Sequence, residues 1–269
     1  MILRSLRAAW SYAALWYGLV TLAAGSLAWG VLALPLRLVL PERAGRALGR
    51  SAISAGFRAY LWGLQLVGAV RLDLRALDAV RGAGALILAP NHPSLLDAVM
   101  VLARVPQAAC VLKAPLTDGV LFGAGARLAR YIRNDSPLEM VRRSVQELRG
   151  GGQLLLFPEG TRTTRLPVSP FRGAIALIAR EAGVPVQTVF IEADSAFLGK
   201  DWPISRRPRL PLHYRVRLGR RFDPPADVHA FVRELEQYFE REMAGPPEPV
   251  VRPAQALEGG SPGVESRPA

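Results

Sequence analysis

The feature that most constrains this chain is an uncharged, apolar segment over residues 8–36. It exceeds the ~20 residues that an α-helix needs to cross the hydrocarbon core of a bilayer. Aromatic side chains of the kind enriched at membrane interfaces occur along it, at Trp10, Tyr12, Trp16, Tyr17 and Trp29. We therefore expect residues 1–50 to form a membrane anchor region.

The mode of attachment is open from the sequence alone. Arginines flank both ends of the segment, at Arg4, Arg7, Arg37, Arg43, Arg46 and Arg50. The positive-inside rule therefore selects no orientation. One tilted spanning helix and a re-entrant hairpin that breaks near Gly25 or Gly30 are both compatible with the pattern. A cleaved signal peptide would normally have a shorter apolar region.

The net charge is consistent with a membrane surface as partner. The chain has 269 residues, with 34 Lys and Arg against 22 Asp and Glu, a formal charge of +12. It carries no zinc-finger, RNP or basic-helix pattern, so we expect no nucleic acid as partner. A basic protein with an apolar end suits an anionic membrane surface better. The single cysteine, Cys110, excludes an internal disulfide.

A histidine and an aspartate follow an expected strand end. The apolar run over residues 84–90 indicates a short buried strand, and residues 95–104 indicate a helix. Pro93 disfavours helical backbone at His92, so the histidine precedes the helix. Asp97 falls in its first turns, where its carboxylate can reach one imidazole nitrogen. This arrangement predicts a general base with its orienting acid; the alternative is a loop histidine and an ordinary first-turn acid.

A second motif, Phe-Pro-Glu-Gly-Thr-Arg over residues 157–162, follows another apolar run at 153–156. Gly160 permits close approach of other groups to the backbone. Arg162 supplies a planar fork of donors that suits phosphate. The alternative is a tight turn with a Glu–Arg surface pair.

Together with Asn-His-x-x-x-x-Asp at residues 91–97, this motif resembles the glycerolipid acyltransferase family, and its lysophosphatidate acyltransferase group in particular. The resemblance spans roughly residues 86–189. It implies an α/β fold with a mixed central sheet flanked by helices, an N-terminal membrane-associated helix or helical hairpin, and neither cofactor nor metal. It implies that His92 and Asp97 are catalytic. The substrate-binding residues it implies are Glu159, Gly160, Thr161, Arg162, Lys113, Arg133 and Arg172.

The family's second motif is altered in this chain. The family has Phe-Ile-Asp-Arg where this sequence has Tyr131-Ile132-Arg133-Asn134, so the arginine stands one place early. The way in which the acceptor's head group is held therefore stays open. Lys113, at the end of a strand expected over residues 108–112, and Arg172, before a helix expected over residues 174–182, could equally be solvated surface residues.

The chemistry follows from what the sequence lacks as well as what it has. Without a Gly-x-Ser-x-Gly elbow, a serine acyl-enzyme is unsupported, so the nucleophile should be an acceptor hydroxyl. The resemblance implies acyl transfer from acyl-CoA or acyl-carrier protein to a lysolipid, most simply 1-acylglycerol 3-phosphate. It places the protein on the inner (cytoplasmic) membrane, with the catalytic domain facing the cytoplasm. Alternatives are another hydroxyl lipid (lyso-ornithine lipid or a pigment lipid), a thioesterase, or an inactive lipid-binding relative.

The rest of the chain is expected to be one acyltransferase domain over residues 51–244. Its first helix, over 51–70, could pack in the core or lie on lipid. A loop over residues 195–211 carries several aromatic and basic residues, and it could dock on lipid head groups or be an ordinary crossover. His213 has no acid at a telling spacing, so we expect a structural role. The composition of residues 245–269 predicts disorder.

Overall fold

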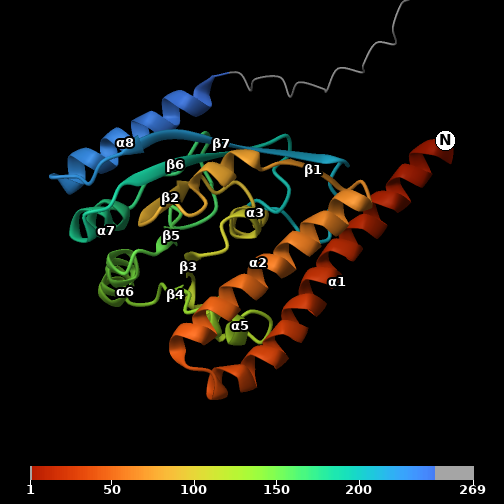
Figure 1. The fold of residues 1–269 in the computed structure, drawn as a ribbon. Coiled ribbons are helices and arrows are strands. Elements are labelled where there is room, and N and C mark those ends of the chain that lie inside the picture. The colour runs from red at the N-terminus through yellow and green to blue at the C-terminus, as the bar shows by residue number, and fades with distance from the viewer. Residues whose placement is uncertain (1, 246–269) are drawn as a thin grey trace, which may run out of the picture.

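The structure, a computed structural model, describes residues 2–245, so all of the expected tail except Gly245 lies outside the described residues. A seven-stranded sheet has the strand order β1-β7-β6-β2-β5-β3-β4, and only the β6–β7 pair is antiparallel. The strands are β1 (Val70–Asp73), β2 (Leu86–Pro90), β3 (Ala108–Leu112), β4 (Ile132–Arg133), β5 (Gln153–Leu155), β6 (Val186–Ala193) and β7 (Leu212–Phe222). The mixed α/β sheet predicted from the sequence is confirmed (Figure 1).

Helices cover both faces of this sheet. They are α1 (Ile2–Val39), α2 (Glu42–Leu66), η1 (Arg75–Val80), α3 (Leu96–Arg104), α4 (Ala114–Asp118), α5 (Gly123–Leu128), α6 (Pro137–Arg149), α7 (Ala174–Ala182) and α8 (Val228–Ala244). One apolar core lies between the sheet and α2, α3 and η1, and a second lies between the sheet and α6, α7 and α8. The central strand β2 is buried at all of its positions, which explains its uninterrupted apolar sequence.

The N-terminal helices α1 and α2 run antiparallel beside the sheet (Figure 1). Of the two arrangements left open by the sequence, the one with a break near Gly25 or Gly30 is not observed, because α1 continues to Val39. A helical glycine costs only ~1 kcal/mol relative to alanine, so these glycines do not end the helix. The chain turns instead at Leu40 and Pro41, since a proline disfavours helical backbone at the preceding residue. Among the described residues, one helix, over Ser5–Val39, is long and apolar enough to cross a membrane.

Arg50 lies in the protein interior and does not flank the membrane segment as a surface charge. Its side chain is only 4% exposed. It donates hydrogen bonds to the carbonyl oxygens of Gln107 and Ala129, at 2.9 and 3.0 Å, and to both carboxylate oxygens of Glu147. The boundary expected at residue 50 therefore falls inside a continuous helix, α2, whose interior packs on the domain.

Candidate active site

Both sequence motifs lie at the carboxyl edge of the sheet. β2 ends at Pro90 and the neighbouring parallel strand β5 ends at Leu155, so the turns that follow them emerge side by side. Ligands of open α/β sheets bind outside the carboxyl ends of the strands, beside a point where the strand order reverses. β2 lies between β5 and β6, which places the His92 turn in such a position.

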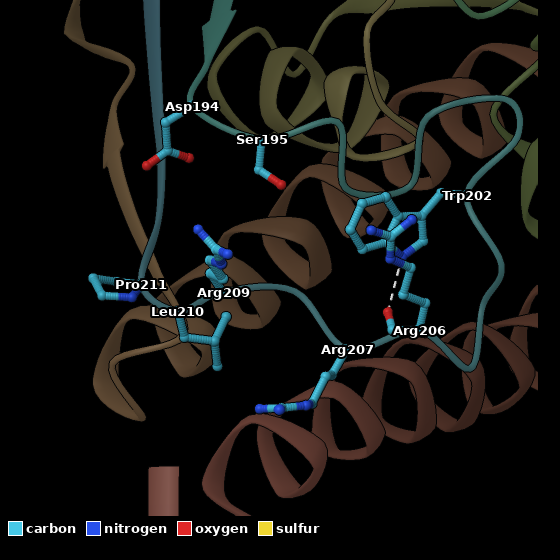
Figure 2. Close-up of a pocket in the computed structure, with 8 residues that line it drawn as sticks. All are labelled: Asp194, Ser195, Trp202, Arg206, Arg207, Arg209, Leu210 and Pro211. Atoms are coloured by element: carbon cyan, nitrogen blue, oxygen red, sulfur yellow. Dashed lines mark hydrogen bonds between the residues drawn. The ribbon is translucent and has the colours of Figure 1, made fainter. Parts of the chain in front are cut away.

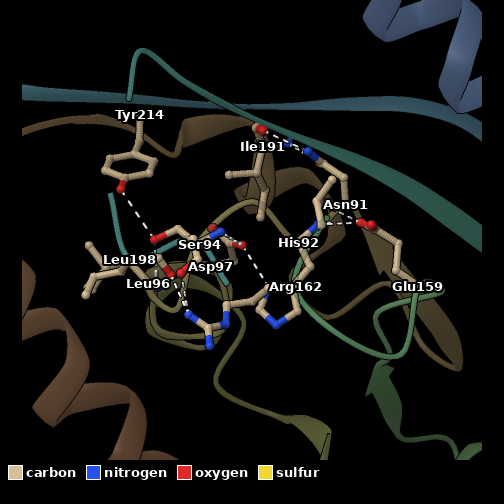
Figure 3. A network of polar contacts seen from close by, with 12 residues as sticks. Asn91, His92, Ser94, Leu96, Asp97, Glu159, Arg162, Ile191, Leu198 and Tyr214 are labelled. Carbon is tan, nitrogen blue, oxygen red and sulfur yellow. Dashed lines mark hydrogen bonds and ion pairs between the residues drawn. The ribbon is translucent and has the colours of Figure 1, made fainter. Parts of the chain in front are cut away.

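His92 and Asp97 form the pair that their spacing predicts. Asp97 Oδ2 lies 2.9 Å from His92 Nδ1 and also accepts the backbone N–H of Ser94 at 2.7 Å (Figure 3). The imidazole is 16% exposed, whereas the Asp97 side chain is fully buried. No described residue makes a hydrogen bond to His92 Nε2. The second ring nitrogen is therefore open to a substrate.

The burial of Asp97 perturbs its ionisation. Burial raises the pKa of the Asp97 carboxyl to about 6, against the lowering effects of the contacts with His92 and of the Ser94 N–H. Asp97 Oδ1 has no hydrogen-bond partner among the described residues, which is consistent with this desolvation. The Asp97 carboxylate therefore depends on the imidazole for its stabilisation. The same contact holds the orientation of the imidazole ring.

Phe157, from the second motif, holds the imidazole from one side. The two rings are stacked, with centroids 3.8 Å apart and planes inclined by 20°. The backbone N–H of Thr163 donates to the carbonyl oxygen of His92 at 2.7 Å. The second motif thus positions the first, a relation that the sequence pattern did not reveal.

Glu159 contributes to the same positioning. Its side chain is buried, and it accepts hydrogen bonds from the backbone N–H of His92 at 2.9 Å and from Thr163 Oγ1 at 2.8 Å. The backbone N–H of Ser169 donates to its other oxygen, at 2.8 Å. The family resemblance implies that Glu159 binds substrate; in the structure both of its carboxylate oxygens accept hydrogen bonds from the protein itself.

Arg162 holds a neighbouring loop. Its Nη1 donates to the carbonyl oxygens of Leu198 and Gly199, at 2.9 and 2.7 Å (Figure 3). These carbonyls belong to the segment between β6 and β7. Only one nitrogen of the guanidinium is used in this way, and its other N–H groups make no hydrogen bond to the described residues. An anion could therefore still bind to the remaining donors.

Four other predicted residues lie at the second motif. Gly160 has a φ of +68°, and a Cβ there would lie 2.6 Å from Arg172 Nε, so the Arg172 side chain passes directly over it. Lys113 Nζ donates to Thr161 Oγ1 at 3.3 Å. Lys113 and Arg172 therefore bring two cationic side chains to the turn that carries Arg162.

Arg133 forms its contacts with residues that do not belong to this cluster. Its guanidinium forms ion pairs with Asp118 and with Asp135, the latter at 2.6 Å. Within the described part of the chain, no hydrogen bond or ion pair joins its side chain to either motif turn. These ion pairs already engage two of the three guanidinium nitrogens of Arg133.

Two features of the site's framework were missed from the sequence. The Asn91 amide joins β2 to β6, since it accepts the N–H of Ile191 at 2.7 Å and donates to the carbonyl of Ile191 at 3.0 Å. The sequence spacing gave no sign of the second feature, the contact of His213 with an acid: its Nδ1 lies 2.6 Å from Asp194 Oδ2. An asparagine at a buried strand end was a usable signal for the first feature.

Comparisons with known proteins agree with this arrangement. The model of the acyltransferase family matches residues 71–192. The 1-acyl-sn-glycerol-3-phosphate acyltransferase of Pseudomonas aeruginosa is 26% identical over 226 residues, 81% of this chain and 84% of that protein. The lyso-ornithine lipid O-acyltransferase of the same organism is 32% identical over 208 residues, 65% of this chain and 79% of that protein.

A solved structure shares the fold. The crystal structure of the 1-acyl-sn-glycerophosphate acyltransferase PlsC from Thermotoga maritima matches with a TM-score of 0.65 and 18% sequence identity, over 88% of this chain and 96% of that one. The matching family model and the two curated relatives define an acyltransferase. The chain belongs to the glycerolipid acyltransferase family, as its two motifs had indicated.

Proposed function

We propose that this enzyme transfers an acyl group from a thioester, acyl-CoA or acyl-carrier protein, to the hydroxyl group of a lysolipid. The observation that carries the proposal is the His92–Asp97 pair, in which Nε2 of His92 makes no hydrogen bond to a serine or cysteine among the described residues. An oriented base without a protein nucleophile suits direct attack by a substrate hydroxyl. We take 1-acylglycerol 3-phosphate as the first acceptor to test, with phosphatidate as its product.

In the proposed reaction, His92 Nε2 takes the proton of the acceptor hydroxyl while the oxygen of that hydroxyl attacks the thioester carbonyl. Asp97 stabilises the imidazolium that forms, because its carboxylate contacts Nδ1. When the tetrahedral intermediate collapses, the carbon–sulfur bond breaks and the imidazolium returns the proton to the leaving thiolate. General-base assistance of this kind contributes roughly 10²–10⁴ in rate.

The cationic side chains at the second motif supply the anion-binding part of the proposal. Arg162 retains free N–H donors, and Lys113 and Arg172 lie at the same turn. An arginine fork binds phosphate through paired, charge-assisted hydrogen bonds. We assign the acceptor's phosphate to these three residues, while Glu159 positions the backbone of His92.

The membrane part of the proposal rests on α1. A helix of this length and apolarity suits a protein whose acceptor and product are both lipids. We place the enzyme on the inner membrane, with its catalytic domain on the cytoplasmic side where thioester donors are made.

A second acceptor is also a candidate. The lyso-ornithine lipid O-acyltransferase named above is 32% identical to this chain. Arg133 and Asn134 replace the Asp-Arg of the second family motif, and Arg133 is already paired with Asp118 and Asp135. An acceptor without a glycerol phosphate would not need an arginine there.

The test is acyl transfer by full-length protein in detergent. Labelled acyl-CoA and acyl-carrier protein are offered with lysophosphatidate, with lyso-ornithine lipid, and with no acceptor. His92→Ala should abolish transfer, while His229→Ala, an exposed histidine on α8, should not. Product on lysophosphatidate supports the first acceptor, and product only on lyso-ornithine lipid supports the second. Release of free acyl groups at the same rate without an acceptor would contradict both.

A further inference from the structure

A cavity of about 480 Å³ lies along the segment that connects β6 to β7, apart from the two motif turns (Figure 2). We call it the arginine pocket. Its lining residues are Asp194, Ser195, Trp202, Arg206, Arg207, Arg209, Leu210 and Pro211. None of them belongs to either acyltransferase motif, so the proposed chemistry leaves the pocket without a role.

The pocket holds positive charge that the described protein does not neutralise. No described carboxylate forms an ion pair with Arg206, Arg207 or Arg209. The acid in the lining, Asp194, is engaged by His213, which contacts one carboxylate oxygen through Nδ1 at 2.6 Å and the other through its backbone N–H at 3.1 Å. Three arginines thus line one cavity, and an anion bound there would offset their like charges.

Aromatic contacts hold two of these arginines in place before any ligand binds. The Arg206 guanidinium lies 4.6 Å from the centre of the Trp202 ring, and Trp202 Nε1 donates to the Arg206 carbonyl oxygen at 2.9 Å (Figure 2). The Arg207 guanidinium lies 5.6 Å from the centre of the Tyr12 ring. Pre-ordered arginine forks favour phosphate, which they bind in a bidentate manner.

The contact with Tyr12 indicates where the phosphate comes from. Tyr12 lies on α1, within the stretch that is long and apolar enough to cross a membrane. Trp10 and Trp16, on the same part of α1, are 48% and 55% exposed. In membrane proteins, exposed tryptophan and tyrosine side chains are enriched at the level of the lipid head groups. We propose that the arginine pocket binds the phosphate of an anionic phospholipid head group.

The same loop connects this pocket to the His92 turn. The first part of this loop contains Leu198. Its carbonyl oxygen accepts hydrogen bonds from Arg162 at 2.9 Å and from the backbone N–H of Leu95 at 3.2 Å. A lipid phosphate held by Arg206, Arg207 and Arg209 therefore fixes a segment that also supports the first turn of α3.

Binding is measured on full-length protein in a neutral detergent, with soluble dihexanoylphosphatidylglycerol as the probe. A ligand that binds only the folded state raises Tm in proportion to the logarithm of its concentration above Kd. The pocket variant is Arg206→Gln/Arg207→Gln/Arg209→Gln. The control is Arg221→Gln/Arg233→Gln/Arg241→Gln, which removes the same charge from exposed positions on β7 and α8.

The probe should raise Tm by several degrees in wild type and in the control. In the pocket variant, the Tm shift should be at most one third of the wild-type shift. Dihexanoylphosphatidylcholine should have little effect on any of them. The single variant Arg209→Gln should weaken binding tenfold or more, which keeps the test available if the triple variant does not fold.

Three results would overturn the proposal. The first is an equal shift in wild type and pocket variant, or none in either. The second is a Tm shift with inorganic phosphate as large as the shift with the lipid at the same concentration, which would assign the pocket to a free anion. The third is a pocket-dependent shift with CoA but not with the lipid, which would assign it to the acyl donor. None of these readouts depends on acyl transfer.

Discussion

Glu159 Oε1 accepts the backbone N–H of His92 at 2.9 Å, so a buried carboxylate from the turn after β5 holds the peptide that carries the proposed general base. Its other oxygen accepts the N–H of Ser169. A motif that suggests phosphate contact thus contributes its acidic residue to the framework. The two motifs occur together because one supports the backbone of the other.

Replacement of Glu159 by glutamine tests this positioning role. The substitution keeps the size of the side chain but removes its charge and places an amide donor among three N–H and O–H donors. Hydrogen bonds to charged groups contribute about 1.5–3 kcal/mol, so the free energy of unfolding should fall by that order. We expect kcat to fall at least tenfold while the KM for the acceptor stays within about twofold, as measured by steady-state kinetics.

Glu240→Gln, at an exposed position on α8, is the matched control and should change neither quantity. An increase in the acceptor KM at unchanged kcat and Tm would return Glu159 to the substrate-binding role that the sequence suggested. The two roles are separated by which kinetic constant moves.

Asp97→Asn should affect both activity and the pH dependence of stability. Loss of the carboxylate removes the group that orients and stabilises the imidazolium, which should lower kcat by roughly 10²–10⁴. Because burial raises the pKa of Asp97 to about 6, the folded protein retains a proton that the unfolded chain releases above about pH 4. The free energy of unfolding should therefore fall as pH rises from about 4 to 6, by up to about 1.4 kcal/mol per unit.

The Asp97→Asn variant should lack this dependence, because an amide does not titrate. Urea unfolding of both proteins across pH 4–7 measures the difference, and Asp201→Asn, at an exposed position, serves as control. A constant difference between wild type and Asp97→Asn over this range would mean that the contact with His92 cancels the effect of burial.

Local pattern predicted the framework of the site well. β3 and α7 begin and end at the residues expected from their apolar runs, over 108–112 and 174–182. The contact between His92 and Asp97 also follows from local spacing, since only the short turn at residues 93–95 and the first residue of α3 separate them. Short-range geometry decides each of these features.

Relations across the sheet were not predictable in the same way. Asp194 reaches His213 only because β6 and β7 pair antiparallel, with Ala193 opposite Tyr214. Arg50 on α2 pairs with Glu147 on α6, a residue 97 positions away in the chain, and nothing in its local sequence distinguishes it from a membrane-flanking arginine. Single-sequence reasoning does not give the register or packing on which these pairs depend.

Gly160→Ala should disturb the anion-binding turn through two separable effects. A residue with a side chain at a φ of +68° costs of order 1–2 kcal/mol. In addition, a Cβ would lie 2.6 Å from Arg172 Nε and force that side chain to move. Gly151→Ala is the control, since Gly151 has a φ of +83° and open space around it. Both variants should lose similar stability, but only Gly160→Ala should raise the acceptor KM, by about fivefold or more.

A KM that rises equally in both variants, or in neither, would show that the position of Arg172 over Gly160 has no part in binding the acceptor. Arg172→Lys adds a separate measurement. A lysine keeps the charge but loses the planar fork, so it should raise the acceptor KM without a change in Tm.

Arg50→Met should strongly destabilise the protein, although the position resembles a surface arginine in sequence. The substitution leaves Glu147, whose side chain is 11% exposed, without its bidentate partner. Breaking a buried ion pair from one side costs about 3–5 kcal/mol, and we expect a loss of that order in urea unfolding. Arg43→Met, at an exposed position near the start of the same helix, should change stability by less than about 0.5 kcal/mol.

The double variant Arg50→Met/Glu147→Leu separates charge from packing. In Arg50→Met the carboxylate of Glu147 keeps only the longer contact with the half-exposed Arg46, at 3.5 Å. Replacing both Arg50 and Glu147 by apolar groups removes this poorly compensated carboxylate, so stability should recover relative to Arg50→Met alone. The hydrogen bonds to the carbonyl oxygens of Gln107 and Ala129 stay broken in both variants. If the double variant is no more stable than the single one, Arg50 holds α2 on the domain through these carbonyl contacts and not through the pair with Glu147.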